Sequence, residues 1–285
     1  SELLRLDPHT LEITARVTPS TAPPGKSRSG EERDGGVYAV YGVGVDDANG
    51  TVWVSNSRQN TVAVYRQADL SLVRQYEPGT VNHARDVVVD QEDGKAYASA
   101  TFANEVVVFD TTSLDVVRRI LIETKAGGRR QSQTFSAASL SYDRVARRLY
   151  VVSNSTNEVA VINTRTDEVE NVFPVPGAKS AIGVSHDPVT DRIFVSAQGT
   201  DNLVVLNGAD GAVIADTPVG AGALNVVFDP VSRQAYVSNR GSSTVTVTDV
   251  DGQIIANFIN ASSSNHVTAD GKGAIFAVNK AVGQN

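Results

Sequence analysis

The most regular feature of this sequence is a short apolar segment that ends in aspartate and occurs six times. The six copies are GVGVD, DVVVD, SLSYD, GVSHD, NVVFD and HVTAD, which end at Asp46, Asp90, Asp143, Asp187, Asp229 and Asp270. Successive aspartates are 44, 53, 44, 42 and 41 residues apart. A period of roughly 20 to 50 residues is the signature of a repeat architecture. We therefore interpret each copy as the first strand of one repeat.

Three more strand-like segments follow in each complete repeat. A turn, in most copies rich in Gly, Asp or Pro, leads to a second segment with an aromatic anchor, such as Trp53 in VWVSN. A third and a fourth segment follow, such as NEVVVFD and LDVVRRI. β-Branched and aromatic residues are enriched and turn residues separate the segments, whereas helical spacing is not sustained. We predict four strands per repeat of about 42 residues, named A to D in chain order.

A four-stranded repeat of this length is typical of a blade of a β-propeller, which predicts an all-β fold. The chain contains five whole blades and two half-blades. Residues 1–17 contain strands C and D without A and B, and residues 267–279 contain strands A and B without C and D. Either the halves join and close a six-bladed ring, or they belong to separate blades of a seven-bladed parent. Both arrangements place residues 1–285 in a single propeller domain.

Aspartate and asparagine recur at the strand ends. An Asp or Asn side chain accepts backbone N–H groups two residues on and holds a turn. We assign this structural role to the aspartates after strand A. The same role is predicted after strand C for Asp7, Asp110, Asn163, Asn207 and Asp249, and after strand B for Asn56, Asn154, Asn239 and Asn279. Their periodicity is the reason, because a turn is needed in every blade and a catalytic group only once.

The segments YVSN and VTVTD, with LRLDPHTLEI near the N-terminus, resemble the YVTN-type β-propeller family, notably exported YncE-like bacterial proteins. The resemblance covers nearly the whole chain apart from two insertions. It implies a seven-bladed propeller in the periplasm, in the cell envelope or secreted, which acts by binding. The chain contains no Met, so Ser1 is not a translated start. These two points lead us to favour seven blades for the parent protein.

Composition narrows the chemistry. The chain contains no Cys, which excludes disulfides, thiolate metal sites and cysteine nucleophiles and fits an oxidising compartment. The net charge of −7 argues against general nucleic-acid binding through a basic surface. No apolar segment approaches the roughly 20 residues of a membrane-spanning helix. We expect a monomer without a cofactor.

Two long insertions lie in connections that share one side of a propeller. The D-to-A and B-to-C connections form this side, which we call the top side, and the A-to-B and C-to-D turns form the bottom side. The first insertion, residues 18–36, is polar and rich in Pro and Gly. The second, residues 123–136, explains the 53-residue spacing and contains Lys125, Arg129 and Arg130. Long loops of this kind are commonly functional.

Further polar residues lie where strand A begins, and we expect them to approach the rim of the central channel. Arginine suits bidentate recognition of carboxylate or phosphate, and histidine suits ligand binding or proton transfer. We therefore predict a top-side site for an anionic ligand or an envelope protein with an acidic segment. Its candidate residues are His83, Arg85, Arg129, Arg130, Asn225 and His266. We interpret His9 and His186 as structural.

Evidence for an enzyme is sparse in the sequence. The four histidines have no metal-ligand spacing, no Gly-rich phosphate loop opens a helix, and no nucleophile elbow is present. The leading hypothesis is thus a non-enzymatic exported binding protein. Two alternatives stay open. One is a lyase or hydrolase at the channel mouth that uses His83 or His266, with or without a divalent metal, and the other is a purely structural envelope component.

Overall fold

The computed structural model describes residues 2–19, 21–22, 25–26, 30, 32–33, 36–37, 40–125, 134–260 and 262–279. It divides into two compact units, Ser1–Ile120 and Leu121–Asn285. We call them the N-terminal and the C-terminal unit and describe each by itself. Among the described residues the only helical element is one 3₁₀ turn, η1 (Ser57–Gln59).

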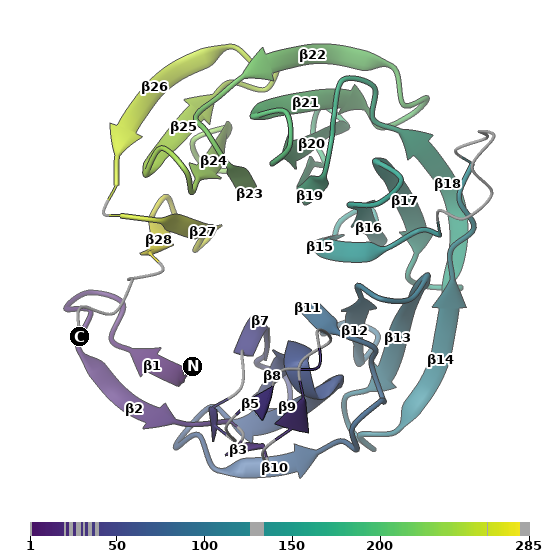
Figure 1. Ribbon diagram of the computed structural model, residues 1–285, viewed down its shortest axis with the longest axis vertical. Coiled ribbons are helices and arrows are strands. Elements are labelled where there is room, and N and C mark those ends of the chain that lie inside the picture. Colours follow the sequence, from purple (N-terminus) through teal and green to yellow (C-terminus); the bar gives the residue numbers. More distant parts are fainter. Residues whose placement is uncertain are drawn as a thin grey trace. The chain divides into compact units, whose positions relative to one another are not determined.

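The described residues of the N-terminal unit form two four-stranded sheets and three two-stranded sheets (Figure 1). The first of the two-stranded sheets consists of β1 (Leu3–Leu6) and β2 (Ile13–Val17). The first whole blade consists of β7 (Val40–Asp46), β8 (Thr51–Asn56), β9 (Thr61–Arg66) and β10 (Leu72–Gln75). The second consists of β11 (Ala84–Asp90), β12 (Lys95–Ala100), β13 (Glu105–Asp110) and β14 (Val116–Leu121), whose last residue belongs to the C-terminal unit.

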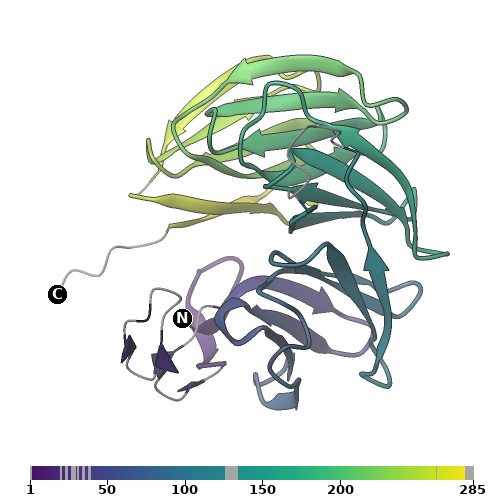
Figure 2. The same ribbon diagram turned by 45° about the vertical axis from the view of Figure 1, so that its right-hand side comes forward.

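Short strands also occur in and beside the first insertion (Figure 2). β3 (Thr21–Ala22) pairs with β6 (Gly36–Val37), and β4 (Gly25–Lys26) pairs with β5 (Glu32–Arg33). Both pairs are antiparallel. The described parts of this insertion therefore form small hairpin ladders, outside the four-strand pattern of the blades.

The C-terminal unit contains three four-stranded sheets and one two-stranded sheet. The third whole blade is β15 (Ala137–Asp143), β16 (Arg148–Ser153), β17 (Glu158–Asn163) and β18 (Glu168–Pro174). The fourth is β19 (Ala181–Asp187), β20 (Arg192–Ala197), β21 (Asn202–Asn207) and β22 (Val213–Pro218). The fifth is β23 (Ala223–Asp229), β24 (Gln234–Asn239), β25 (Thr244–Thr248) and β26 (Ile254–Ile259). The half-blade is β27 (Ser264–Ala269) and β28 (Ile275–Asn279).

These sheets confirm the predicted all-β propeller class and its repeat. In each of the five whole blades, strands A, B, C and D follow one another in the sheet as they do in the chain. Strand A of one blade contacts strand A of the next within each unit, as for β7 with β11 and β19 with β23. The two half-blades are two-stranded sheets at the predicted places. The number of blades in a complete ring stays a prediction.

The aspartates after strand A hold the following turn in all six repeats, as predicted. Asp90 Oδ1, for example, accepts the N–H groups of Glu92 and Asp93 at 3.1 and 3.2 Å. The side chains after strand C do the same, as shown by Asp110, which accepts the N–H groups of Thr112 and Ser113 at 2.9 and 2.7 Å. These turn bonds explain the period of the residues without any catalytic role.

In the fifth blade, the asparagine after strand B has a different role from the predicted one. Asn239 is buried, and its Nδ2 donates to the hydroxyls of Thr244 and Thr246 at 3.1 and 2.8 Å. It therefore ties strand B to strand C of the same blade, and the next turn is held by other groups. A buried amide needs such partners because an unpaired polar group loses its bonds to water.

Blades pack on one another through side chains that alternate along strands B and C. In the N-terminal unit, Trp53 of the first blade and Phe109 of the second are fully buried, with ring centroids 5.4 Å apart. Tyr76 lies 4.8 Å from Phe109 and donates its hydroxyl to the carbonyl of Leu114 at 2.8 Å. The aromatic anchor of strand B thus belongs to the packing between blades.

Candidate functional site

Two of the predicted site residues meet in the N-terminal unit, at the start of β11. His83 comes immediately before β11, and Arg85 is the second residue of that strand. This is the top side of the second blade, where the D-to-A connection enters strand A. The neighbouring B-to-C connections, η1 of the first blade and residues 101–104 of the second, lie on the same side.

Hydrogen bonding and stacking fix the position of His83. Its backbone is left-handed, with φ +53°, and its N–H donates to Asn60 Oδ1 at 2.8 Å. The imidazole stacks on Phe102, with centroids 4.0 Å apart and an interplanar angle of 13°. The side of this pair facing solvent is open, since Phe102 is 58% exposed. The ring nitrogens of His83 have no hydrogen-bond partner in the part of the chain that the structure describes.

Arg85 is held by an aromatic residue and not by a carboxylate. Its Nη2 donates to the Tyr41 hydroxyl at 2.6 Å, and its guanidinium carbon lies 4.2 Å from the Tyr41 ring centroid. Stacking of this kind orients a guanidinium and leaves donors available. Arg85 forms no ion pair with any described residue, so its charge is not neutralised there.

A second arginine belongs to the same region. Arg58 lies in η1 and is exposed. Burial lowers the pKa of His83, and the charges of Arg85 and Arg58 lower it further. His83 is therefore a neutral ring at neutral pH, and the positive charge comes from the two arginines. We call these three residues, with Tyr41 and Phe102, the cationic–aromatic cluster.

The other two described candidates lie in the C-terminal unit. Asn225 is buried on β23, and its Oδ1 accepts the N–H of Val267 on β27 at 2.9 Å. This bond ties adjacent strands A together, so the carboxamide oxygen is committed to the fold. His266 is half-buried on β27. The two pairs of candidates therefore belong to different units.

Arg129 and Arg130 lie outside the described residues, but both ends of the second insertion are anchored. Glu158 is buried and accepts the Thr124 hydroxyl at 2.6 Å and the Lys125 N–H at 2.8 Å. At the other end, the Ser155 hydroxyl donates to the Thr134 carbonyl at 2.6 Å and Phe135 is buried. The insertion therefore leaves and re-enters the top side of the third blade at defined points.

The bottom side carries a histidine cluster within the C-terminal unit. His186 is almost fully buried, with Nδ1 3.0 Å from Asp143 Oδ2 and Nε2 2.9 Å from Asp191 Oδ1. Its ring stacks on Tyr150 with centroids 4.3 Å apart. Asp143 ends strand A of the third blade, whereas His186 and Asp191 belong to the fourth. The cluster joins two blades, which agrees with the structural role that we predicted for His186.

Two buried aspartates on the bottom side, Asp143 and Asp187, are expected to make the stability of the fold depend on pH in acidic solution. Burial alone would raise the pKa of Asp143 and of Asp187. Asp143 accepts hydrogen bonds from His186 and two N–H groups, and Asp187 accepts them from Arg233, Thr190 and the Val189 N–H. In both cases these bonds outweigh burial and lower the pKa of the aspartate below 3.8. Their stabilisation is complete above that pH and is lost as the pH falls through the lowered values.

We therefore expect the thermal unfolding midpoint to fall as the pH is lowered below about 4, where folded and unfolded carboxyls differ in protonation. The double variant Asp143→Asn, Asp187→Asn should be less stable at neutral pH and should depend less on pH in that range. Scanning calorimetry at a series of pH values measures both slopes. Parallel curves for the two proteins would contradict the assignment.

The described residues were compared with the requirements of a metal centre and of a membrane-spanning helix. Within the described ranges, no group of three or more His, Asp or Glu side chains is arranged to hold a metal ion. Among the described residues there is also no helix long and apolar enough to cross a membrane.

Comparison with known proteins supports the fold and goes no further. No family model matches the sequence, and no curated protein matches it. Among solved structures, Kuenenia stuttgartiensis hydrazine synthase is similar, with a TM-score of 0.75 and 15% sequence identity. The match covers 98% of this chain and 89% of that one. At this identity the likeness shows only that the two chains share an all-β fold of repeated four-stranded blades.

Proposed function

We propose that this protein is a non-enzymatic binding protein that recognises an anionic ligand, or an acidic segment of a protein, through the cationic–aromatic cluster. The observation that carries the proposal is the pair Arg85 and Arg58, neither of which forms an ion pair with a described residue. Two arginines on one side of the unit, one of them stacked on the Tyr41 ring, match the requirements for binding carboxylate or phosphate.

The location and family of the protein are part of the same proposal. We propose that it acts outside the cytoplasm, in the periplasm or cell envelope or as a secreted protein, and that it is a YVTN-type repeat protein. The absence of Cys and the repeated YVSN-type segments support this. Arg129 and Arg130, which the sequence suggests as further cations for an anionic ligand, lie outside the described residues.

The test is binding of a fluorescently labelled oligoglutamate peptide and, separately, of inorganic phosphate. Arg85→Ala is expected to weaken peptide binding about tenfold, because it removes one charge-assisted contact worth about 1.4 kcal/mol. Arg58→Ala should act in the same direction. Added salt should weaken peptide binding to the native protein more than to Arg85→Ala, because the native site has one more charge for the salt to screen.

Arg165→Ala is the matched control, because Arg165 is an exposed arginine in a C-to-D turn on the bottom side. It should leave peptide binding unchanged. Equal affinities for the native protein, Arg85→Ala and Arg58→Ala would exclude the cluster as the site. Recovery of chemically altered peptide or phosphate would contradict the non-enzymatic part of the proposal.

A further inference from the structure

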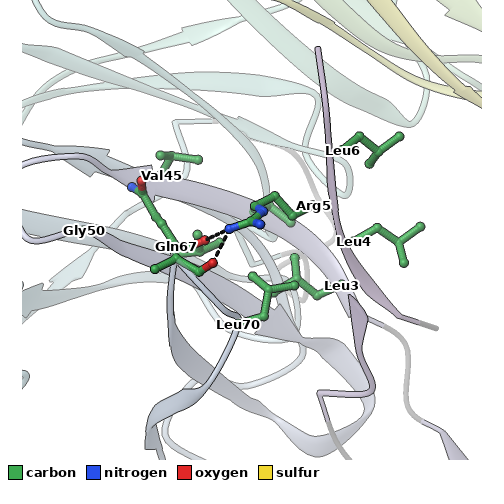
Figure 3. Close-up of a pocket in the computed structure, with 11 residues that line it drawn as sticks. Leu3, Leu4, Arg5, Leu6, Val45, Gly50, Gln67 and Leu70 are labelled. Atoms are coloured by element: carbon green, nitrogen blue, oxygen red, sulfur yellow. Dashed lines mark hydrogen bonds between the residues drawn. The ribbon is translucent and has the colours of Figure 1, made fainter. Parts of the chain in front are cut away.

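The two arginines of the cationic–aromatic cluster differ from other arginines of their unit, which are bonded to acceptors of the fold. Arg5 donates from Nη1 to two backbone carbonyls of the C-to-D turn of the first blade (Figure 3). Arg119 forms an ion pair with Glu105 at 2.7 Å. By contrast, neither Arg85 nor Arg58 has an ion-pair partner or a carbonyl acceptor among the described residues. Their charges therefore act on the side chain that lies between them.

That side chain is His83, and the described groups around it contribute two cations and no anion. Its own strand contributes Arg85, and η1 contributes Arg58. The B-to-C connection at residues 101–104 contributes the Phe102 ring and contains no titratable side chain. Burial lowers the pKa of His83 most, and the charges of Arg85 and Arg58 lower it further. The surroundings of the imidazole thus disfavour a third positive charge.

Two carboxylates close in sequence leave this balance unchanged. Asp86, three residues after His83, lies against Gly42 of β7 and accepts the Val87 N–H at 3.0 Å. Glu77, in the connection that leads to β11, is exposed. Neither carboxylate is among the groups that shift the pKa of His83. A bound anion would therefore supply the negative charge that the described neighbours of His83 lack.

The imidazole has the hydrogen-bonding atoms that such an anion requires. Stacking on Phe102 holds the ring, and neither ring nitrogen has a hydrogen-bond partner among the described residues. A neutral imidazole has one N–H donor and one acceptor, whereas a protonated imidazole has two donors and a positive charge. Protonation therefore converts His83 from a neutral neighbour of the arginines into a third group able to bind an anion.

Proton binding and anion binding at this position favour each other. In the free cluster, a proton on His83 adds a positive charge beside two others, which costs free energy. A bound carboxylate or phosphate offsets this cost, so the pKa of His83 is higher in the complex than in the free protein. Linkage requires an equal effect in the other direction, so protonated His83 binds the anion more tightly.

We propose, on the basis of the proposed binding function, that an anion bound at the cationic–aromatic cluster causes His83 to take up one proton, so that the site binds more tightly in mildly acidic solution. Above the higher pKa of His83 in the complex, the affinity does not depend on pH. As the pH falls from that value to the lower pKa of the free protein, the affinity rises by at most about tenfold per pH unit, the limit for one proton.

The test is the affinity of the labelled oligoglutamate peptide at a series of pH values. Glutamate carboxyls have an ordinary pKa of about 4.3, so the peptide stays ionised between about pH 7.5 and pH 5.5. Affinity for the native protein should rise several-fold as the pH falls through this range, whereas His83→Asn should show no such rise. Asparagine is chosen because it tolerates the left-handed backbone of this position, with φ +53°.

Nuclear magnetic resonance measures the same linkage in the native protein. Each of the four histidines gives a ring C–H signal, and the signal absent from His83→Asn belongs to His83. Its titration midpoint should lie below 6.5 in the free protein and should move upward when the peptide is bound. A midpoint that the peptide does not move would overturn the proposal, whatever the variant does.

His9→Asn is the matched control, because His9 is an exposed histidine in the turn between β1 and β2 of the same unit. It should leave the affinity and its pH dependence unchanged. Peptide binding that weakens in Arg85→Ala but does not vary with pH would overturn the proton linkage and leave the proposed function in place. An equal pH dependence in His83→Asn would do the same. Absence of peptide binding at every pH would overturn both.

Discussion

Phe109→Ala is expected to lower the free energy of unfolding by about 3–5 kcal/mol, the usual cost of removing a fully buried phenylalanine. The ring lies between two blades, against Trp53 and Tyr76, with centroids 5.4 and 4.8 Å away. Its removal leaves a cavity that paired strands on both sides are unable to close. Chemical denaturation followed by the fluorescence of Trp53, the single tryptophan, measures the loss directly in the N-terminal unit.

Phe102→Ala is the matched control, because it removes the same ring from an exposed position in the same blade. It should change stability by less than about 0.5 kcal/mol, as is usual for surface positions. It should instead weaken anionic-ligand binding, since the His83 ring stacks on Phe102. A similar loss of stability in the two variants would mean that packing between the blades does not depend on Phe109.

Asp187→Ala is expected to destabilise the C-terminal unit by about 2–4 kcal/mol. The carboxylate is fully buried and forms a bidentate ion pair with Arg233 of the next blade, with N–O distances of 2.5 and 2.6 Å. Removing one partner of a buried pair typically costs about 3–5 kcal/mol. The loss of stability is smaller here because the Arg233 side chain is one third exposed and is hydrated again when its partner is removed. Calorimetry and local hydrogen exchange at residues 181–197 measure the effect.

Asp229→Ala is the control that separates the cost of losing the turn hydrogen bonds from the cost of losing the ion pair. Asp229 has the same repeat position, is equally buried and accepts the N–H groups of Val231 and Ser232 at 3.2 and 2.9 Å. It has no such arginine among the described residues, so its loss should cost less than the loss of Asp187. In a double-mutant cycle, the effects of Asp187→Ala and Arg233→Ala should be strongly non-additive. Additive effects would show that the two side chains act independently.

The repeat made most of the fold predictable. The aspartate that ends each strand A recurs at regular intervals because every blade needs the same turn, and its hydrogen bonds are as predicted. The prediction that Asn239 holds a turn was wrong, because its amide instead donates to the hydroxyls of Thr244 and Thr246 on the next strand of the sheet. Sequence position places a side chain at a strand end, but only strand pairing decides which groups it reaches.

The candidate site was predictable in part. His83 and Arg85 are close in sequence and enter the same strand, so their proximity followed from the repeat. Arg58 was missed because it comes from a different blade and no spacing connects it with Arg85. Only the fold places η1 beside the start of β11, where the Ser57 hydroxyl donates to the carbonyl of Ala84 at 2.5 Å. Asn225 was a candidate because it lies close to the related position in the fifth repeat, but its side chain joins two strands A.

The sequence by itself determined the turns, the strands and their order in each blade. Hydrophobic alternation, turn residues and the repeat period each act over a few residues to a few tens of residues, so a single chain segment contains them. The unpaired pattern of the N-terminal segment, strands C and D without A and B, was also present in the sequence. Only the tertiary structure decided that this segment covers the outer part of the first blade and leaves Val43 exposed while Val87 is buried. Burial depends on which surfaces meet across blades, and that information is not contained in any single repeat.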